Sequence, residues 1–125
     1  MAEATPAPVW LTAATGGIVY ANRAFSELTG LRAEQLHGDV WLSLIHPDDI
    51  ASVAQGRDRA FVEGHQPYDF VARFRDASGG WRWMHASGQP RFDQRGAFTG
   101  YVGMAVDETP ARRAEADLHA SETRL

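Results

Sequence analysis

The chain has 125 residues, enough for one domain with its own core and with little room for a second. Hydrophobic residues make up 44% and charged residues 22%, which excludes a collagen-like or wholly disordered chain. There is no cysteine, so disulfides and thiolate chemistry are excluded, and the net charge of -4 disfavours nucleic-acid binding. No apolar run is long enough to span a bilayer. We therefore expect a cytoplasmic domain without direct membrane contact. Its parent protein can still carry a membrane anchor elsewhere.

The first part of the chain predicts a strand hairpin followed by a short helix. Residues 1–8 are rich in Ala and Pro and are expected to form a flexible lead-in. Apolar and β-branched residues at 9–13 and 18–20, separated by a Gly-rich turn, predict two paired strands. Asn22 is a good helix N-cap and Gly30 a good residue just past a helix end, so a short helix is predicted between them.

The longest internal helix is predicted to begin at Pro47 and to run to about Glu63. Proline suits the first helical position, and Asp48 and Asp49 place negative charge where the helix dipole favours it. We interpret His46 and these two acids as a helix start. One His and two Asp also have the composition of a metal or acid–base site, so a small-molecule enzyme that uses them is the alternative from another class.

The rest of the chain changes from helical to strand periodicity and back. Alternating residues at 67–75, 81–92 and 97–106 predict an antiparallel meander. Thr109 and Pro110 then predict the start of an exit helix. Small and apolar residues follow on this helix at heptad spacing, which predicts that two chains pair as a homodimer. The members of this seam are Ala111, Ala114, Leu118, Ser121 and Leu125.

Taken in order, these segments resemble the PAS sensor domain family over about residues 9–109. The matching stretches are Ile18-Val19-Tyr20-Ala21-Asn22, Ile45-His46-Pro47-Asp48-Asp49, Trp81-Arg82-Trp83 and Asp107-Glu108-Thr109. The resemblance implies an α+β PAS fold, a five-stranded antiparallel sheet with short helices on one face and a C-terminal exit helix. It divides the chain into a lead-in at 1–8, a PAS domain at 9–107 and a signalling helix at 108–125.

The same resemblance implies a sensory and dimerisation module of a multidomain signalling protein, of the histidine kinase or diguanylate cyclase type. The output domain would follow in the same parent chain. The implied mechanism is that ligand binding or a quaternary change shifts the exit helix. The sequence carries no phosphate-binding Gly loop, kinase signature or nucleophile elbow, so no catalytic residue is predicted for this domain.

The resemblance also implies a cavity between the sheet and the helix that begins at Pro47. Few polar residues are expected to face it, so a ligand would be small and apolar; the alternative is a core filled by its own side chains. Candidate lining residues are Phe25, Leu28, Trp41, Leu44, Val53, Ala54, Phe61, Phe70, Ala72, Phe74, Met84 and Met104.

No cofactor and no metal are expected. The cysteine-dependent flavin and linked-chromophore photochemistries of the family need a residue that this chain lacks. No histidine lies between Pro47 and Glu63, where relatives often place a haem ligand. A redox or gas sensor with non-covalently held flavin, or with haem, is the alternative within the same fold.

The junction between the last strand and the exit helix is the candidate signal relay. Asp107 is expected to pair with a strand arginine, Arg82 or Arg73, and Thr109 is expected to begin the helix. The alternative is an ordinary helix start without a signalling role. Trp81 and Trp83 share one strand face and are expected either to mark an interface or to be covered by the lead-in or the exit helix. 

Overall fold

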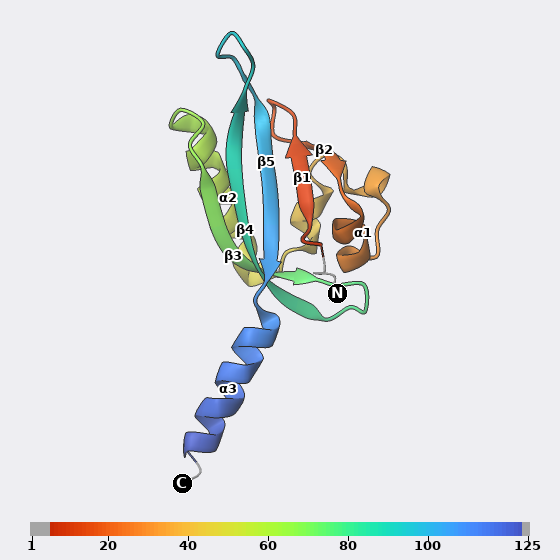
Figure 1. The fold of residues 1–125 in the computed structure, drawn as a ribbon, viewed down its shortest axis with the longest axis vertical. Coiled ribbons are helices and arrows are strands. Elements are labelled where there is room, and N and C mark those ends of the chain that lie inside the picture. The colour runs from red at the N-terminus through yellow and green to blue at the C-terminus, as the bar shows by residue number, and fades with distance from the viewer. Residues whose placement is uncertain (1–5, 124–125) are drawn as a thin grey trace, which may run out of the picture.

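A five-stranded antiparallel sheet forms the body of the protein, with its strands in the order β2-β1-β5-β4-β3 (Figure 1). The computed structural model describes residues 6–123. The strands are β1 (Val9–Thr12), β2 (Ile18–Ala21), β3 (Tyr68–Arg75), β4 (Trp81–Phe92) and β5 (Phe98–Asp107). The helices are α1 (Arg23–Thr29), α2 (Pro47–Val62) and α3 (Thr109–Thr123), with two 3-10 turns at Ala33–Leu36 and Val40–Leu44. This is the α+β architecture that the sequence predicts.

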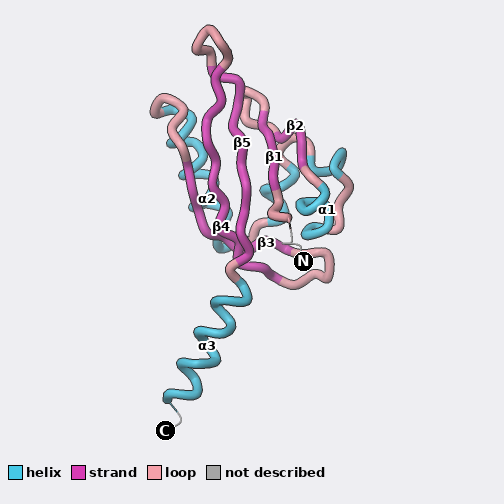
Figure 2. Tube along the Cα trace, viewed as in Figure 1, coloured by secondary structure: helices cyan, strands magenta, loops and turns pink. Residues whose placement is uncertain are grey.

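The helix α3 leaves the end of the sheet and extends away from the domain (Figure 2). Its residues from Pro110 to Ser121 are exposed. Among the described residues, none of the helices combines the length and the apolar character needed to cross a membrane. Residues 1–5 of the expected lead-in and Leu125 of the expected seam lie outside the described residues.

The side chain of Asn22 joins the start of α1 to β1. Its Oδ1 accepts the amide of Phe25 at 3.1 Å, which caps the helix, and the amide of Val9 at 2.9 Å. Its Nδ2 donates to the carbonyl of Ala7 at 3.0 Å. The helix ends as predicted at Gly30, which adopts a left-handed φ of 74°. Ala7, which lies in the expected lead-in, is thus held against the start of α1.

Only one face of the sheet carries the hydrophobic core. Ala72, Met84 and Ala105 are buried on that face, where α1 and α2 cover it. The opposite face leaves Val71, Val102, Met104 and Val106 exposed. The prediction that Met104 lines the cavity is therefore wrong. Met104 pairs with Ser87 on the outer face, because the strand alternation that buries Ala105 points its neighbour outward.

One row across the inner face sets the shape of the core. Trp10 in β1 pairs with Gly103 in β5, Gly103 pairs with Gly88 in β4, and Gly88 pairs with Tyr68 in β3. A methyl group at Gly103 would overlap the Trp10 indole, and one at Gly88 would overlap the Tyr68 ring. The two glycines thus form a floor for the core, with the Trp10 ring lying over Gly103 and the Tyr68 ring lying over Gly88.

Replacing Gly103 by Ala should destabilise the domain by about 1–3 kcal/mol, because the new methyl group forces the Trp10 ring out of its place in a packed core. Urea unfolding measures the loss. Gly56→Ala is the matched control: Gly56 lies within α2 with open space around it, so the same change should be neutral or stabilising. Equal losses of stability at both positions would contradict the claim that the Trp10 ring leaves no room for a side chain at Gly103.

Candidate functional site

The cavity lies between the inner face of the sheet and the helices, and it is almost filled. Its free volume is about 30 Å³, whereas pockets for drug-sized ligands measure roughly 300–1,000 Å³. The residues that surround it are Pro8, Trp10, Thr12, Gly16, Ile18, Phe25, Leu28, Trp41, Arg57, Phe61, Tyr68, Phe70, Phe74, Met84, Tyr101 and Ala105. Space of this size holds a water molecule or two and no larger ligand without rearrangement.

The predicted lining residues divide into four groups. Those that surround the cavity are Phe25, Leu28, Trp41, Phe61, Phe70, Phe74 and Met84. Leu44, Val53 and Ala72 are buried in the core without reaching the free space, Ala54 is half-buried on α2, and Met104 faces outward. The lining residues that sequence reasoning missed include three large aromatic ones, Trp10, Tyr68 and Tyr101. Strand alternation could have found Tyr68, which lies two residues before Phe70 on the same face.

A few polar groups reach this apolar space. The Tyr101 hydroxyl donates to the Gln66 carbonyl at 2.7 Å. Burial raises the pKa of Tyr68, against a smaller opposing effect of a hydrogen bond from Trp10, so Tyr68 is neutral at physiological pH. Arg57 lies at the edge, where it pairs with Asp39 at 3.3 Å. The Trp41 indole N–H is buried without a hydrogen-bond partner among the described residues.

The second candidate site is the junction between β5 and α3. The guanidinium of Arg82 donates to Asp107 Oδ2 from Nε at 2.9 Å and from Nη2 at 2.6 Å. The other oxygen of Asp107 accepts the amide of Thr109 at 2.9 Å. Burial alone would raise the pKa of Asp107, but the hydrogen bonds from Thr109 and Arg82 outweigh it and hold that pKa below its ordinary value. The predicted pairing of Asp107 with Arg82 is present.

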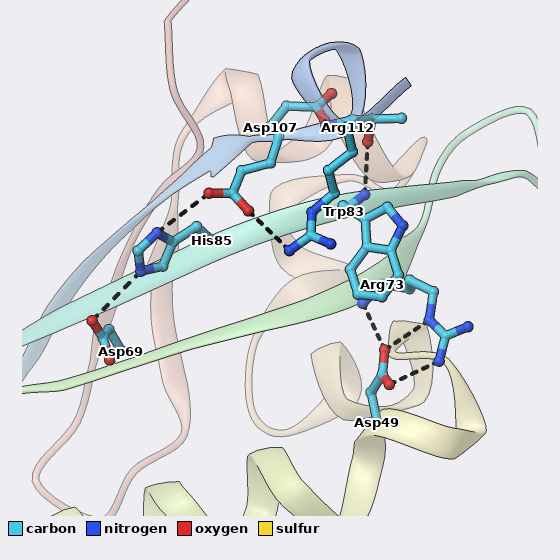
Figure 3. Close-up of polar contacts among 9 residues, drawn as sticks. Asp49, Asp69, Arg73, Trp83, His85, Asp107 and Arg112 are labelled. Carbon is cyan, nitrogen blue, oxygen red and sulfur yellow. Dashed lines mark hydrogen bonds and ion pairs between the residues drawn. The ribbon is translucent and has the colours of Figure 1, made fainter. Parts of the chain in front are cut away.

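Strand β4 also holds the junction through its backbone. The amide of Trp83 donates to the Thr109 hydroxyl at 2.7 Å (Figure 3). The Trp83 carbonyl accepts the amide of Glu108 at 2.8 Å. The Thr109 hydroxyl therefore binds the sheet at the residue where α3 begins. His85 lies near Asp69 at 3.5 Å and near Glu108 at 3.7 Å, so it stands between β3 and the junction.

Arg73 has a different partner from the one considered for it. Its Nη2 donates to Asp49 Oδ1 at 2.9 Å, while its Nε and its amide donate to Oδ2 at 3.0 and 2.9 Å. These bonds from Arg73 hold the pKa of Asp49 below its ordinary value. Arg73 is thus not a partner of Asp107, because β3 lies at the sheet edge beside the start of α2 and β4 separates it from β5.

The His46, Asp48 and Asp49 side chains have structural roles. His46 Nδ1 accepts the amide of Asp48 at 3.1 Å and so caps α2, and Asp49 is engaged by Arg73. Within residues 6–123, no group of three His, Asp or Glu side chains is placed to hold a metal ion. This arrangement matches the interpretation as a helix start.

The two tryptophans of β4 differ in their surroundings. Trp81 is 38% exposed and its ring lies 4.7 Å from that of His46. Trp83 is half-buried because Arg112 of the exit helix covers it, with the guanidinium carbon 4.4 Å from the ring centre. Among residues 6–123, the exit helix is therefore an element that covers this face at Trp83.

Comparison with known proteins fits this geometry. A family model described as PAS fold matches residues 18–105. The chain belongs to the PAS family. It is a sensory module of the kind found in signalling proteins, and the PAS domain is not itself catalytic.

Two curated proteins are similar to this PAS domain. An uncharacterized protein of Sinorhizobium fredii, y4lL, is 39% identical over 115 residues, and the C4-dicarboxylate transport sensor protein DctS of Rhodobacter capsulatus is 31% identical over 112 residues. These matches cover 92% and 89% of the chain. The chain spans 14% and 17% of the lengths of these two relatives.

Solved structures share the PAS architecture. A sensory box histidine kinase/response regulator from Burkholderia thailandensis gives a TM-score of 0.69 at 28% identity, over 94% of this chain and 88% of that chain. The N-terminal domain of a diguanylate cyclase with PAS/PAC sensor from Marinobacter aquaeolei gives 0.75 at 17% identity, over 86% and 99%. The second similarity concerns the fold alone.

Replacing Asp107 by Asn should cost about 1 kcal/mol of stability at neutral pH, a modest value because both paired side chains keep some contact with water. The folded-state pKa of Asp107 lies below its ordinary value of 3.8. The contribution of the ionised Asp107 side chain to stability is therefore complete above pH 3.8, the ordinary pKa, and is lost as the pH falls through the folded-state pKa. Urea unfolding at a series of pH values measures the difference between variant and wild type.

The control is Asp117→Asn, which neutralises an exposed acid further along α3 and should change stability little at any pH. A cost at Asp107 that stays constant down to about pH 2 would contradict an origin in the ionised pair.

Proposed function

We propose that this PAS domain is a relay and dimerisation module of a cytoplasmic signalling protein of the histidine kinase or diguanylate cyclase type. A change in the domain, caused by a small apolar ligand or by a quaternary change, alters how α3 is held. The helix then passes that change to an output domain later in the parent chain. The similarity to DctS and to the sensory box kinase structure supports this type of parent protein.

The observation that carries the proposal is the contrast between the two ends of α3. The junction is tied to the sheet by the Arg82–Asp107 pair and by the bonds of Thr109 and Glu108 to Trp83. Beyond its first turn the helix is exposed. An element that is fixed at one end and exposed from Pro110 to Ser121 transmits a change at the fixed end to whatever binds the exposed part.

The seam on α3 supports pairing of two chains. Leu118 is 62% exposed, and Ala111 and Ala114 are exposed on the same helix. These residues recur at the spacing of a coiled coil, in which small and apolar side chains interlock with those of a partner helix. The pairing would place the two output domains side by side, so that a rotation or shift of the helices changes their relative position.

We also propose that the domain works without a resident cofactor. The row of Trp10, Gly103, Gly88 and Tyr68 places two aromatic rings over the sheet, in the space between the sheet and α2. The free volume beside these rings is about 30 Å³. A ring system the size of flavin does not fit into it unless both aromatic side chains move away. This supports a quaternary signal or a ligand of a few atoms.

Leu118→Lys should weaken self-association. Burying one leucine side chain is worth about 1.5–3 kcal/mol, so its loss from a paired seam should raise the dissociation constant of the dimer at least tenfold. Sedimentation velocity over a concentration series measures this constant. Val62→Lys is the control, because Val62 is an equally apolar residue, 83% exposed at the end of α2 and away from the seam. A dimer that survives Leu118→Lys unchanged would refute pairing along α3.

The purified protein should show no absorption band in the visible range, and its native mass should contain only the polypeptide. A visible band accompanied by extra mass would instead identify a haem or flavin sensor, and the proposal of a cofactor-free domain would be wrong.

A further inference from the structure

The indole of Trp83 lies between two guanidinium groups. The central carbon of Arg73 is 4.9 Å from the ring centre, and that of Arg112 is 4.4 Å away (Figure 3). Arginine over an aromatic face is attracted by the ring quadrupole, and tryptophan provides the strongest such attraction. The three side chains come from β3, β4 and the first turn of α3, so the stack joins the edge of the sheet to the exit helix.

Each guanidinium is neutralised by its own carboxylate, which allows two cations to share one ring. Asp49 in the first turn of α2 holds Arg73 through both carboxylate oxygens, with bonds of 2.9 and 3.0 Å. Glu108 faces Arg112 at 3.4 Å, and Arg112 is 45% exposed. The link is therefore strong at the end nearer α2 and weak at the end nearer α3.

We propose that the Arg73–Trp83–Arg112 stack couples the start of α2 to the docking of α3. The first turn of α2 fixes Arg73, Arg73 orients the Trp83 ring, and the ring holds the first turn of α3 through Arg112. Since Arg57 and Phe61 of α2 border the cavity, a rearrangement there that shifts α2 reaches the exit helix by this route. These are positioning residues, and the inference rests on the relay role proposed for α3.

The stack differs from the Arg82–Asp107 pair in what it connects. That pair joins β4 to β5 and holds the junction whatever α2 does. The stack begins on a helix that covers the cavity, at Asp49, and ends on the exit helix. A displacement of α2 therefore moves Arg73 off the Trp83 ring, lets the ring shift away from Arg112, and frees the first turn of α3 while the junction itself stays in place.

The test is a double-mutant cycle read out by amide hydrogen exchange in α3. Asp49→Asn should loosen Arg73, and Trp83→Leu should remove the ring. Each should speed exchange of the amides of residues 112–114 roughly fivefold, relative to core amides of β5, which is the effect of losing one such cation–ring contact. In the Trp83→Leu background, Asp49→Asn should add nothing. Nuclear magnetic resonance of the whole chain gives the individual exchange rates.

Asp48→Asn is the matched control, because it removes the same charge one residue away. The Asp48 carboxylate faces His46 at 3.9 Å, and among the described residues it makes no hydrogen bond to Arg73, so exchange in α3 should not change. Arg112→Gln provides a second background on an exposed residue whose replacement leaves the core intact. If Asp49→Asn speeds exchange equally with and without Trp83 or Arg112, the proposed coupling is overturned.

The exchange measurement reports helix docking within the domain and requires neither dimerisation nor an output domain. If α3 proved not to relay a signal to an output domain, a positive exchange result would still show that the stack couples α2 to α3. A negative result would remove this route of coupling without affecting pairing along the Leu118 seam.

Discussion

The register between β4 and β5 is the constraint on which the rest of this structure depends. The two strands pair continuously from Met84 opposite Asp107 to Arg91 opposite Gly100. This single alignment places Gly88 beside Gly103 at the floor of the core, and it places Arg82 within reach of Asp107 at the junction. A slip by one residue would turn both sets of side chains to the other face. The packing of the core and the docking of the exit helix therefore depend on the same register.

Charge pairing at the junction shows how a sheet can hold a helix without a large apolar interface. The contacts include the Arg82–Asp107 ion pair, two hydrogen bonds to the backbone of Trp83, the approach of His85 to Glu108 and one cation on the Trp83 ring. Each contributes little by itself in a partly exposed setting. Elements held by several weak contacts open at low cost, as expected of a part that has to change its position.

The core and the outer face of the sheet serve different purposes. The inner face is filled by aromatic rings that rest on two glycines, which leaves little free volume for a ligand. The outer face leaves Val102, Met104 and Val106 exposed. A domain built in this way combines a small cavity with exposed apolar side chains on the outer face of the sheet, an arrangement that suits signalling by association at least as well as signalling by ligand binding.

The sequence by itself determined the kinds of elements and most of their ends, because these depend on neighbours along the chain. Asn22 and Gly30 enclose α1 as predicted, Pro47 begins α2, and Trp81–Phe92 is a strand over its full predicted length. Such caps, prolines and alternating patterns act within one turn of helix or one pair of residues. The pairing of Asp107 with a strand arginine was also predictable, because an ionised carboxylate is stabilised by a nearby cation.

Only the tertiary structure decided which arginine that partner is, which way Met104 faces and how full the cavity is. Each depends on residues that the chain brings together from distant strands. Arg73 goes to Asp49 because β3 lies at the edge of the sheet beside α2, and β4 separates it from Asp107. Likewise, Trp10 and Tyr68 fill the core only because two glycines from other strands lie between them. Strand order and register are long-range properties, and local patterns do not contain them.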